Sequence, residues 1–327
     1  MDDGFRMRRV LFLQKPEFVR AHAPIVAAFA RRAGDDIEVV AAGSPDEVPA
    51  GSDFDVVITP TLPWLPQALS RAGSYRWIHF LSAGVDAIWE MPFEKDGGVV
   101  LTKSSGVHGT SIAEYVVGSI LFFAKSFDRY VAQGARREWS RHWMDKIDGK
   151  SVLIVGLGHV GTEIARRCSA FGMRVAGVQR TPRPSPFVDA VHPMEVVDGL
   201  LGDVDYLVVA LPLTRETRGW MSGSRLARLK ENAVVVDVSR GGVVDHSALL
   251  ERLEAGLLRG AALDVFEAEP LPADSPLWAR PNVLVTPHVS GTTPNYIERA
   301  MEIFLDNFTA YREGRPLTTP VRPEAGY

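Results

Sequence analysis

The sequence has almost no thiol chemistry: Cys168 is the one cysteine among 327 residues, so no internal disulfide can form. Chains without disulfides are typical of reducing compartments. The N-terminus, from Met1 to Gly4, is acidic and unlike a signal peptide. We therefore expect a cytoplasmic protein in which Cys168 is a buried structural residue rather than a nucleophile.

Long apolar runs and a marked excess of charge are also missing. No run reaches the roughly 20 residues that a membrane-spanning helix needs, and the formal net charge is only −4. We therefore expect neither a membrane nor a nucleic acid as a partner. With 46% hydrophobic and 23% charged residues, the composition is that of a globular protein, and the length suggests two domains.

What the sequence does contain is a regular alternation of short apolar runs and helical patterns. Strands are expected at 10–13, 37–41, 56–59, 77–81, 99–101, 152–155, 174–178, 206–210, 233–238, 261–263 and 283–285. Helices are expected at 17–32, 111–127, 246–254 and 295–312. This alternation predicts an α/β fold with two Rossmann-like, doubly wound parallel-sheet domains and a cleft between them.

The most informative motif lies mid-chain, where the apolar run 152–155 leads into three glycines. Gly156, Gly158 and Gly161 have the G-x-G-x-x-G spacing, and a helical pattern follows them. This context is typical of a dinucleotide site, in which the glycines allow a tight turn, close approach of a pyrophosphate and close helix packing. Ordinary turn glycines are the plainer alternative. We expect residues 105–292 to bind the dinucleotide, and residues 1–104 plus 293–327 to form a flavodoxin-like, substrate-binding domain.

Three polar residues follow strands of the second predicted sheet. Arg240, Glu269 and His288 come after the runs at 233–238, 261–263 and 283–285. Ligands of open α/β sheets bind at the carboxyl ends of the strands. Arg240 can grip a carboxylate, His288 can exchange a proton, and Glu269 can orient the imidazole and favour its protonated form. Each residue alone also fits surface charge or a structural role, but their occurrence together favours catalysis.

These segments resemble those of one family, the D-isomer-specific 2-hydroxyacid dehydrogenases, over nearly the whole chain. The similar segments are VGLGHVG at 155–161, DVSRGGVVD at 237–245, ALDVFEAEPLP at 262–272 and NVLVTPH at 282–288. The resemblance implies hydride transfer between NAD(P)H and a small 2-oxo acid, giving a D-2-hydroxy acid. It makes His288 the general acid, Glu269 its support, and Arg240 the group that binds the substrate carboxylate and polarises the carbonyl.

The resemblance also implies ligand contacts elsewhere. Backbone N–H groups of Ala83 and Gly84, in a loop that could also be an ordinary turn, would receive the carboxylate beside Arg240 and His288. Asp264 would contact the nicotinamide carboxamide, and Ile112 would pack on the ring. The predicted cofactor contacts are Ile112, Gly156, Gly158, His159, Val160, Gly161, Gln179, Arg180, Thr181, Leu211, Pro212, Thr217, Val238, Ser239, Asp264 and Gly291. No metal site is predicted.

The residues after the run 174–178 bear on which nicotinamide dinucleotide is used. NAD sites usually place an acid there to receive the ribose 2′-hydroxyl. Here Gln179 takes that position, and Arg180 and Thr181 follow. A neutral Gln179 does not repel a 2′-phosphate, and the next two residues can bond one. We therefore expect a preference for NADP(H), with NAD(H) possible. The alternative is that Arg180 and Arg183 are simply exposed loop charges.

Within the family, the contexts at 211–214 and 276–278 most resemble glyoxylate/hydroxypyruvate reductases and related 2-ketoacid reductases. Substrate selectivity is expected to depend on residues 60–64, 79–81 and 289–292. Trp64 either lines this pocket or belongs to the core, and His108 is a weaker candidate for touching substrate. The alternative function is a dehydrogenase-like sensor or corepressor that binds dinucleotide without physiological turnover. The resemblance further implies a homodimer formed through the cofactor domain.

Overall fold

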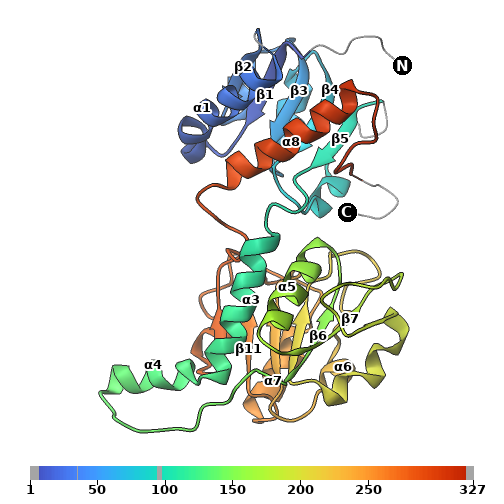
Figure 1. The fold of residues 1–327 in the computed structure, drawn as a ribbon. Helices are drawn as coiled ribbons and strands as arrows, with labels where there is room; N and C mark the ends of the chain where they lie inside the picture. Colours follow the sequence, from blue (N-terminus) through green and yellow to red (C-terminus); the bar gives the residue numbers. More distant parts are fainter. Residues whose placement is uncertain (1–6, 35, 94–97, 322–327) are drawn as a thin grey trace. The chain divides into compact units, whose positions relative to one another are not determined.

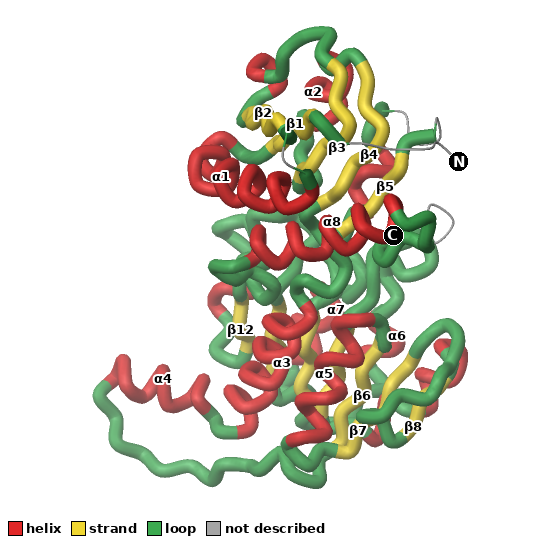
Figure 2. The backbone as a smooth tube through the Cα atoms, turned by 45° about the horizontal axis from the view of Figure 1, so that its top comes forward, coloured by secondary structure: helices red, strands yellow, loops and turns green. Residues whose placement is uncertain are grey.

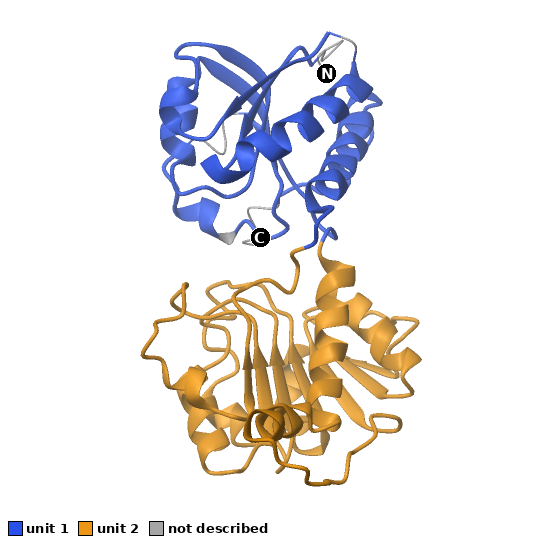
Figure 3. Cartoon of the chain, turned by 90° about the vertical axis from the view of Figure 1, so that its left-hand side faces the viewer, with its two compact units in different colours: residues 1–107, 293–327 blue, residues 108–292 orange. Residues whose placement is uncertain are grey.

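The computed structural model describes residues 7–34, 36–93 and 98–321, so the acidic segment from Met1 to Gly4 lies outside the described residues. The chain divides into two compact units (Figure 3). Unit 1 comprises Met1–Val107 and Thr293–Tyr327, and unit 2 comprises His108–Thr292. Both are α/β units built on a parallel sheet, as the alternation of the sequence predicts.

Unit 1 contains a five-stranded parallel sheet in the order β2-β1-β3-β4-β5. Its elements are β1 (Arg9–Leu13), α1 (Pro16–Ala33), β2 (Glu38–Ala42), β3 (Asp53–Thr59), α2 (Leu65–Arg71), β4 (Ser74–Phe80), β5 (Val100–Lys103) and α8 (Tyr296–Arg312). This strand order, with a reversal between β1 and β3, is that of flavodoxin-like doubly wound sheets. α1 and α8 lie side by side on the sheet (Figures 1 and 2), and Arg32 and Glu302 join them at 2.8 Å.

A polar chain runs through the interior of unit 1. The Trp77 indole N–H donates to Thr102 Oγ1 at 2.7 Å, and Thr102 lies 2.8 Å from His79 Nδ1. His79 Nε2 lies 3.1 Å from Ser104 Oγ, and the Ser104 hydroxyl donates to the Phe80 carbonyl. Since the Ser104 proton goes to that carbonyl, His79 is the donor at Nε2 and the acceptor at Nδ1.

The substrate pocket was expected to include residues 79–81, and the structure corrects this. His79, Phe80 and Leu81 are completely buried. Both faces of β4 pack into the core, because Phe80 belongs to one buried apolar cluster of unit 1 and Leu81, the next residue, to the other. Burial lowers the pKa of His79 to about 3, which keeps the ring neutral. These three side chains therefore belong to the core. Trp64, half-buried against the same unit's core, also packs rather than standing open.

Unit 2 contains a seven-stranded parallel sheet in the order β12-β11-β10-β9-β6-β7-β8. The strands are β6 (Ser151–Val155), β7 (Arg174–Val178), β8 (Ala190–His192), β9 (Tyr206–Val209), β10 (Val234–Asp237), β11 (Gly260–Leu263) and β12 (Val283–Val285). The first six in chain order have the Rossmann arrangement 3-2-1-4-5-6. The strand order of this sheet reverses between β6 and β9. The glycine turn after β6 therefore lies at the topological switch point, where open α/β sheets bind their ligands.

The helices of unit 2 are α3 (Gly109–Ala124), α4 (Phe127–Arg136), α5 (His159–Ala170), α6 (Gly223–Leu226) and α7 (His246–Glu254). They differ from those expected at the end of α3 and in two additional helices, α4 and α6. The predicted helix 111–127 is wrong at its end: Ser126 adopts φ 54°, which stops α3 and redirects the chain into α4. α3 and α5 pack side by side (Figure 2). Over the described ranges, no helix has the length and apolar character needed to cross a bilayer.

Candidate active site

The glycine turn after β6 has the backbone geometry that its spacing predicts. Gly156 has φ 105°, and a Cβ there would lie 2.7 Å from the Ala210 carbonyl oxygen. A Cβ on Gly161 would lie only 1.9 Å from the Gly156 oxygen. No atom of the described chain lies within 4 Å of a Cβ built on Gly158, the N-cap of α5. The helix start is therefore open where its first N–H groups and its dipole favour an anion.

The loops after β10, β11 and β12 lie together because these strands are paired in register. Asp237 pairs with Leu263, and Leu263 pairs with Val285. The loops also touch: a Cβ on Gly241 would lie 1.9 Å from the Phe266 carbonyl oxygen. Arg240 and Glu269 are thus delivered by neighbouring loops, and His288 follows the next strand along the same sheet edge.

His288 and Glu269 form a direct pair. His288 Nδ1 lies 2.8 Å from Glu269 Oε2, and Glu269 Oε1 accepts the backbone N–H of Phe266 at 2.9 Å. Because a carboxylate can only accept, Nδ1 carries the proton and Nε2 is the outward nitrogen. The two side chains are 45% and 37% exposed, so the pair is open to a ligand.

The backbone of His288 is held in an unusual conformation by Asp264. His288 has φ 54°, in the left-handed region that histidine rarely adopts. Buried Asp264 accepts the N–H groups of the two following residues, Val289 at 2.9 Å and Ser290 at 3.0 Å. It also accepts the hydroxyl of Thr286 at 2.6 Å. Asp264 therefore fixes the loop that presents the imidazole.

The Arg240 loop is fixed in a similar way by a buried carboxylate. Asp237, which ends β10, is fully buried and accepts both the backbone N–H and the hydroxyl of Ser239 through Oδ1. The Ser239 carbonyl in turn accepts Arg240 Nη1 at 2.8 Å. The half-buried guanidinium is thus oriented by its own loop.

The predicted 2′-phosphate residues lie on an exposed loop after β7. The Gln179 amide donates to the Arg183 carbonyl at 3.2 Å, and Arg180 pairs with Glu216 at 3.2 Å. The Arg180 and Glu216 side chains are 62% and 76% exposed, so the pair can exchange partners at little cost. Thr181 is exposed. Glu216 was not predicted as the partner of Arg180, because the two residues lie 36 positions apart in the chain.

Several other predicted cofactor residues have structural partners in this unit. The Thr217 hydroxyl donates to the Pro212 carbonyl at 2.6 Å and so braces the turn after β9. Leu211 and Val238 are buried, and Ile112 is partly buried against α5 and the sheet. The Gly291 carbonyl accepts His108 Nδ1 at 2.9 Å. His159 and Val160 form the first turn of α5. Contacts of all these residues with a cofactor stay predictions.

Tyr115 and Thr286 also support the His288 loop, and neither was predicted to do so. Tyr115, on α3, has its hydroxyl 2.9 Å from that of Thr286, and burial raises the pKa of Tyr115 to about 12. The phenol therefore stays protonated. No pattern in the sequence links α3 to the loop after β12, since the pairing arises from packing.

In unit 1, the predicted Ala83 and Gly84 lie half-buried in the loop after β4.

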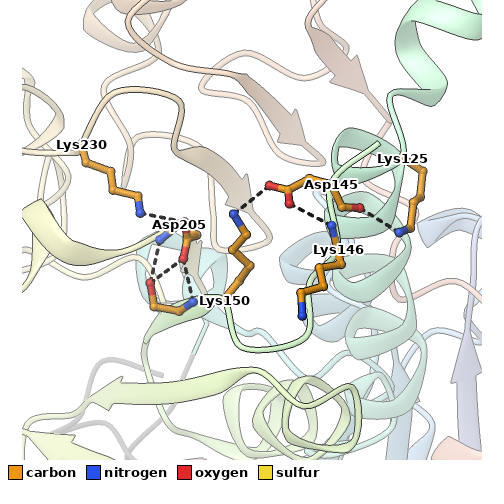
Figure 4. A network of polar contacts seen from close by, with 7 residues as sticks. Lys125, Asp145, Lys146, Lys150, Asp205 and Lys230 are labelled. Carbon is orange, nitrogen blue, oxygen red and sulfur yellow. Dashed lines mark hydrogen bonds and ion pairs between the residues drawn. The ribbon is translucent and has the colours of Figure 1, made fainter. Parts of the chain in front are cut away.

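A cavity of about 340 Å³ lies at the opposite, amino end of the unit 2 strands. Four of the charged residues that line it form two ion pairs (Figure 4): Lys150 pairs with Asp145 at 2.8 Å and Lys230 with Asp205 at 2.7 Å. Burial alone would raise the pKa of Asp205, but its bonds to Lys230 and Ser151 hold that pKa below the usual value. In the parts of the chain that the structure describes, no group of three or more His, Cys, Asp or Glu is placed to hold a metal ion.

Comparison with known proteins decides the family. The family model described as D-isomer specific 2-hydroxyacid dehydrogenase, NAD binding domain, matches residues 117–290. The chain belongs to the D-isomer-specific 2-hydroxyacid dehydrogenase family. Members of this family are oxidoreductases, and the chain is accordingly a D-2-hydroxyacid dehydrogenase that uses a nicotinamide dinucleotide. Its two parallel sheets are those of 2-hydroxyacid dehydrogenase structures, so the predicted fold class is confirmed.

Three relatives of this dehydrogenase illustrate the match. A glyoxylate/hydroxypyruvate reductase of Arabidopsis thaliana is 34% identical over 258 residues, which are 78% of this chain and 81% of that protein. The crystal structure of an NADPH-dependent glyoxylate/hydroxypyruvate reductase from Sinorhizobium meliloti, with NADP and sulfate, has TM-score 0.85 at 29% identity and covers 98% of this chain and 100% of that one. A D-3-phosphoglycerate dehydrogenase of Methanocaldococcus jannaschii is 32% identical over 69% of this chain, which spans only 43% of that protein.

Proposed function

We propose that this dehydrogenase uses NADPH to reduce a small 2-oxo acid of the glyoxylate or hydroxypyruvate type to a D-2-hydroxy acid. The observation that carries the proposal is the open His288–Glu269 pair at 2.8 Å, on the sheet edge that also presents Arg240. The names of the Arabidopsis and Sinorhizobium relatives support the substrate class.

The glycine turn fits a dinucleotide pyrophosphate. Gly158 leaves open space at the start of α5, and the N–H groups of His159, Val160 and Gly161 have no earlier helical turn to bond. Gly156 and Gly161 hold this shape because neither position has room for a side chain. We assign the diphosphate to these residues and the nicotinamide side to Ile112 and Asp264. When bound, the reduced cofactor supplies the hydride.

The side chains of the candidate site divide the remaining work. Arg240 binds the substrate carboxylate through its forked guanidinium and draws electron density from the adjacent carbonyl. His288 donates its Nε2 proton to the carbonyl oxygen as negative charge develops there. Glu269 accepts Nδ1–H throughout, so it directs Nε2 outward and stabilises the imidazolium before the transfer. Backbone N–H groups of Ala83 and Gly84 are assigned to the carboxylate.

The preference for NADPH is proposed from the loop after β7. Gln179 brings no negative charge, Arg180 is exposed, and its partner Glu216 is more exposed still. A 2′-phosphate carries more charge than one carboxylate and can replace Glu216 as the partner of Arg180. The NADPH-dependent Sinorhizobium enzyme, solved with NADP, supports this assignment.

We further propose that the protein is a homodimer formed through unit 2. Trp139 and Trp143, in the segment after α4, are 97% and 99% exposed, and Phe127 and Val131 on α4 are 46% and 69% exposed. Large apolar side chains exposed to this degree over one segment of the chain are typical of surfaces that another chain covers. Sedimentation equilibrium should give twice the chain mass, and a double Trp139→Ser, Trp143→Ser variant should shift it toward the monomer.

One panel of assays tests the proposed reaction. Glyoxylate, hydroxypyruvate and longer 2-oxo acids are each paired with NADPH and with NADH, and nicotinamide oxidation is followed by absorbance. We expect steady turnover of at least one short 2-oxo acid, with a lower KM for NADPH than for NADH. Tight NADPH binding without turnover of any 2-oxo acid would instead fit a dinucleotide sensor.

A further inference from the structure

A histidine outside the three catalytic candidates touches the supports of both candidate loops. His246 is the first residue of α7, and its helix start is fixed because Asp245 caps the N–H of Ala248 at 3.0 Å. His246 Nε2 lies 3.3 Å from Asp237 Oδ2. Its ring also lies against that of Phe266, with 5.8 Å between centroids and 63° between planes.

The first contact leads to Arg240. Asp237 is fully buried, and a buried carboxylate is costly unless hydrogen-bond donors surround it. Oδ1 is satisfied by Ser239, the residue whose carbonyl orients Arg240, whereas Oδ2 has His246 as its donor. Because Asp237 can only accept, His246 must carry a proton on Nε2. Loss of this donor would leave Oδ2 to recruit groups from the Arg240 loop.

The second contact leads to His288. The Phe266 backbone N–H holds Glu269, and Glu269 holds the imidazole of His288. The same segment is in tight contact with the Arg240 loop, since the Gly241 backbone leaves no room for a Cβ against the Phe266 carbonyl. His246 therefore packs against Phe266, at the start of the Glu269 loop, and also donates a hydrogen bond to Asp237, the carboxylate that fixes the Arg240 loop.

We propose that His246 is a positioning residue for substrate binding: its Nε2–H satisfies buried Asp237 and thereby keeps the Arg240 guanidinium in register with the Glu269–His288 pair. The inference rests on the proposed roles of Arg240 and His288. It assigns to His246 no contact with substrate or cofactor. Its effect is expected mainly on the KM of the 2-oxo acid, because Arg240 holds the carboxylate in both ground and transition states.

Matched variants separate the hydrogen bond from the packing. His246→Phe keeps an aromatic ring beside Phe266 but removes the donor, whereas His246→Gln keeps an N–H that reaches as far as Nε2. With glyoxylate and hydroxypyruvate as probes, we expect H246F to raise KM about tenfold with a smaller loss of kcat. H246Q should stay within about twofold of the parent enzyme, and the Kd for NADPH should be unchanged in both. Ser247→Ala, at the exposed next position on α7, is the control.

A second background tests whether Asp237 mediates the effect. Asp237→Asn is neutral and needs no charged or strong donor, so H246F should raise KM much less in the D237N chain than in the parent. Should H246F not fold, His246→Asn replaces it, because the shorter amide does not reach Oδ2. KM should then rise in H246N and not in H246Q.

The outcomes distinguish this inference from the proposed function. An unchanged KM in H246F, or an equal loss in H246F and H246Q that follows a lower Tm, overturns the positioning role and makes His246 a structural residue. Arg240→Lys is measured in parallel. If it leaves the KM of every 2-oxo acid unchanged, the proposed function itself fails, whatever the His246 variants do.

Discussion

Two histidines, one in each unit, show how the position of a residue relative to a strand end decides what it does. His79 lies inside β4 of unit 1, is completely buried, and takes part in a chain of hydrogen bonds in which both ring nitrogens have partners. His288 lies beyond β12 of unit 2, is 45% exposed, and has a carboxylate on one nitrogen. The interior of a parallel sheet makes histidine a neutral core residue, whereas the carboxyl edge leaves it available for proton transfer.

The largest expected effect is on catalysis at the edge. His288→Ala removes the proposed acid, so kcat should fall about 10²- to 10⁴-fold while the Kd for NADPH and the Tm change little. Stopped-flow absorbance and NADPH fluorescence measure these quantities. His192→Ala, on β8, is the matched control. Retention of more than a tenth of the activity would remove His288 from the role of acid.

The interior histidine should control stability in acid instead. Unfolding exposes His79 and restores its ordinary pKa of 6.5, whereas the folded pKa is about 3. Below pH 6.5 the unfolded chain therefore binds a proton that the folded chain excludes, and stability falls as the pH drops toward 3. Between pH 7 and 4.5 this one group should cost roughly 2–3 kcal/mol of unfolding free energy.

Urea unfolding of the parent protein and of His79→Leu at both pH values isolates this contribution. The variant should be less stable at pH 7, because Thr102 and Ser104 lose their partner, but its stability should decline less with acid. Parallel declines in the two proteins would contradict a neutral buried His79. The KM for NADPH should not change, since unit 2 is untouched.

A smaller effect is expected at the exposed loop after β7. Arg180→Asp replaces the proposed partner of the 2′-phosphate by a repelling charge, so the ratio of kcat/KM for NADPH to that for NADH should fall about tenfold. Arg183→Ala, in the same loop, provides a comparison. An unchanged ratio would show that Arg180 is only a surface charge.

The smallest effect concerns the acid that faces Arg180. Glu216→Gln frees Arg180 from an exposed ion pair, and such pairs contribute little. We therefore expect the KM for NADPH to fall by only about two- to threefold, with that for NADH unchanged. An increase in the KM for NADPH would mean that Glu216 orients Arg180 rather than competing for it.

Much of this architecture follows from local patterns. The apolar runs predicted eleven strands of the two sheets to within a few residues each, and the glycine spacing predicted the turn after β6. Local sequence could not show β8, a three-residue edge strand without a continuous apolar run, or the end of α3 at Ser126, which depends on one left-handed residue. The local sequence also predicted that His79 lines a pocket. An aromatic-rich strand end has the same sequence pattern whether its side chains are buried in the core or exposed to a ligand.

The candidate site was predictable where residues follow strand ends and unpredictable where tertiary packing supplies the partners. Arg240, Glu269 and His288 were recognisable from order and spacing. The buried carboxylates Asp237 and Asp264 acquire their partners from loops and from α7, at separations that no local pattern marks. The residues that present the reactive groups are therefore harder to find than the reactive groups themselves.

The backbone of His288 has a cost of its own. A β-carbon in the left-handed region is strained by roughly 1–2 kcal/mol, whereas glycine and asparagine tolerate that conformation well. The catalytically inactive His288→Gly variant should consequently have a higher Tm than the parent protein. The strained backbone lowers the stability of the fold at one residue and orients the imidazole of His288. A substitution that relieves this strain would raise thermal stability but abolish catalysis.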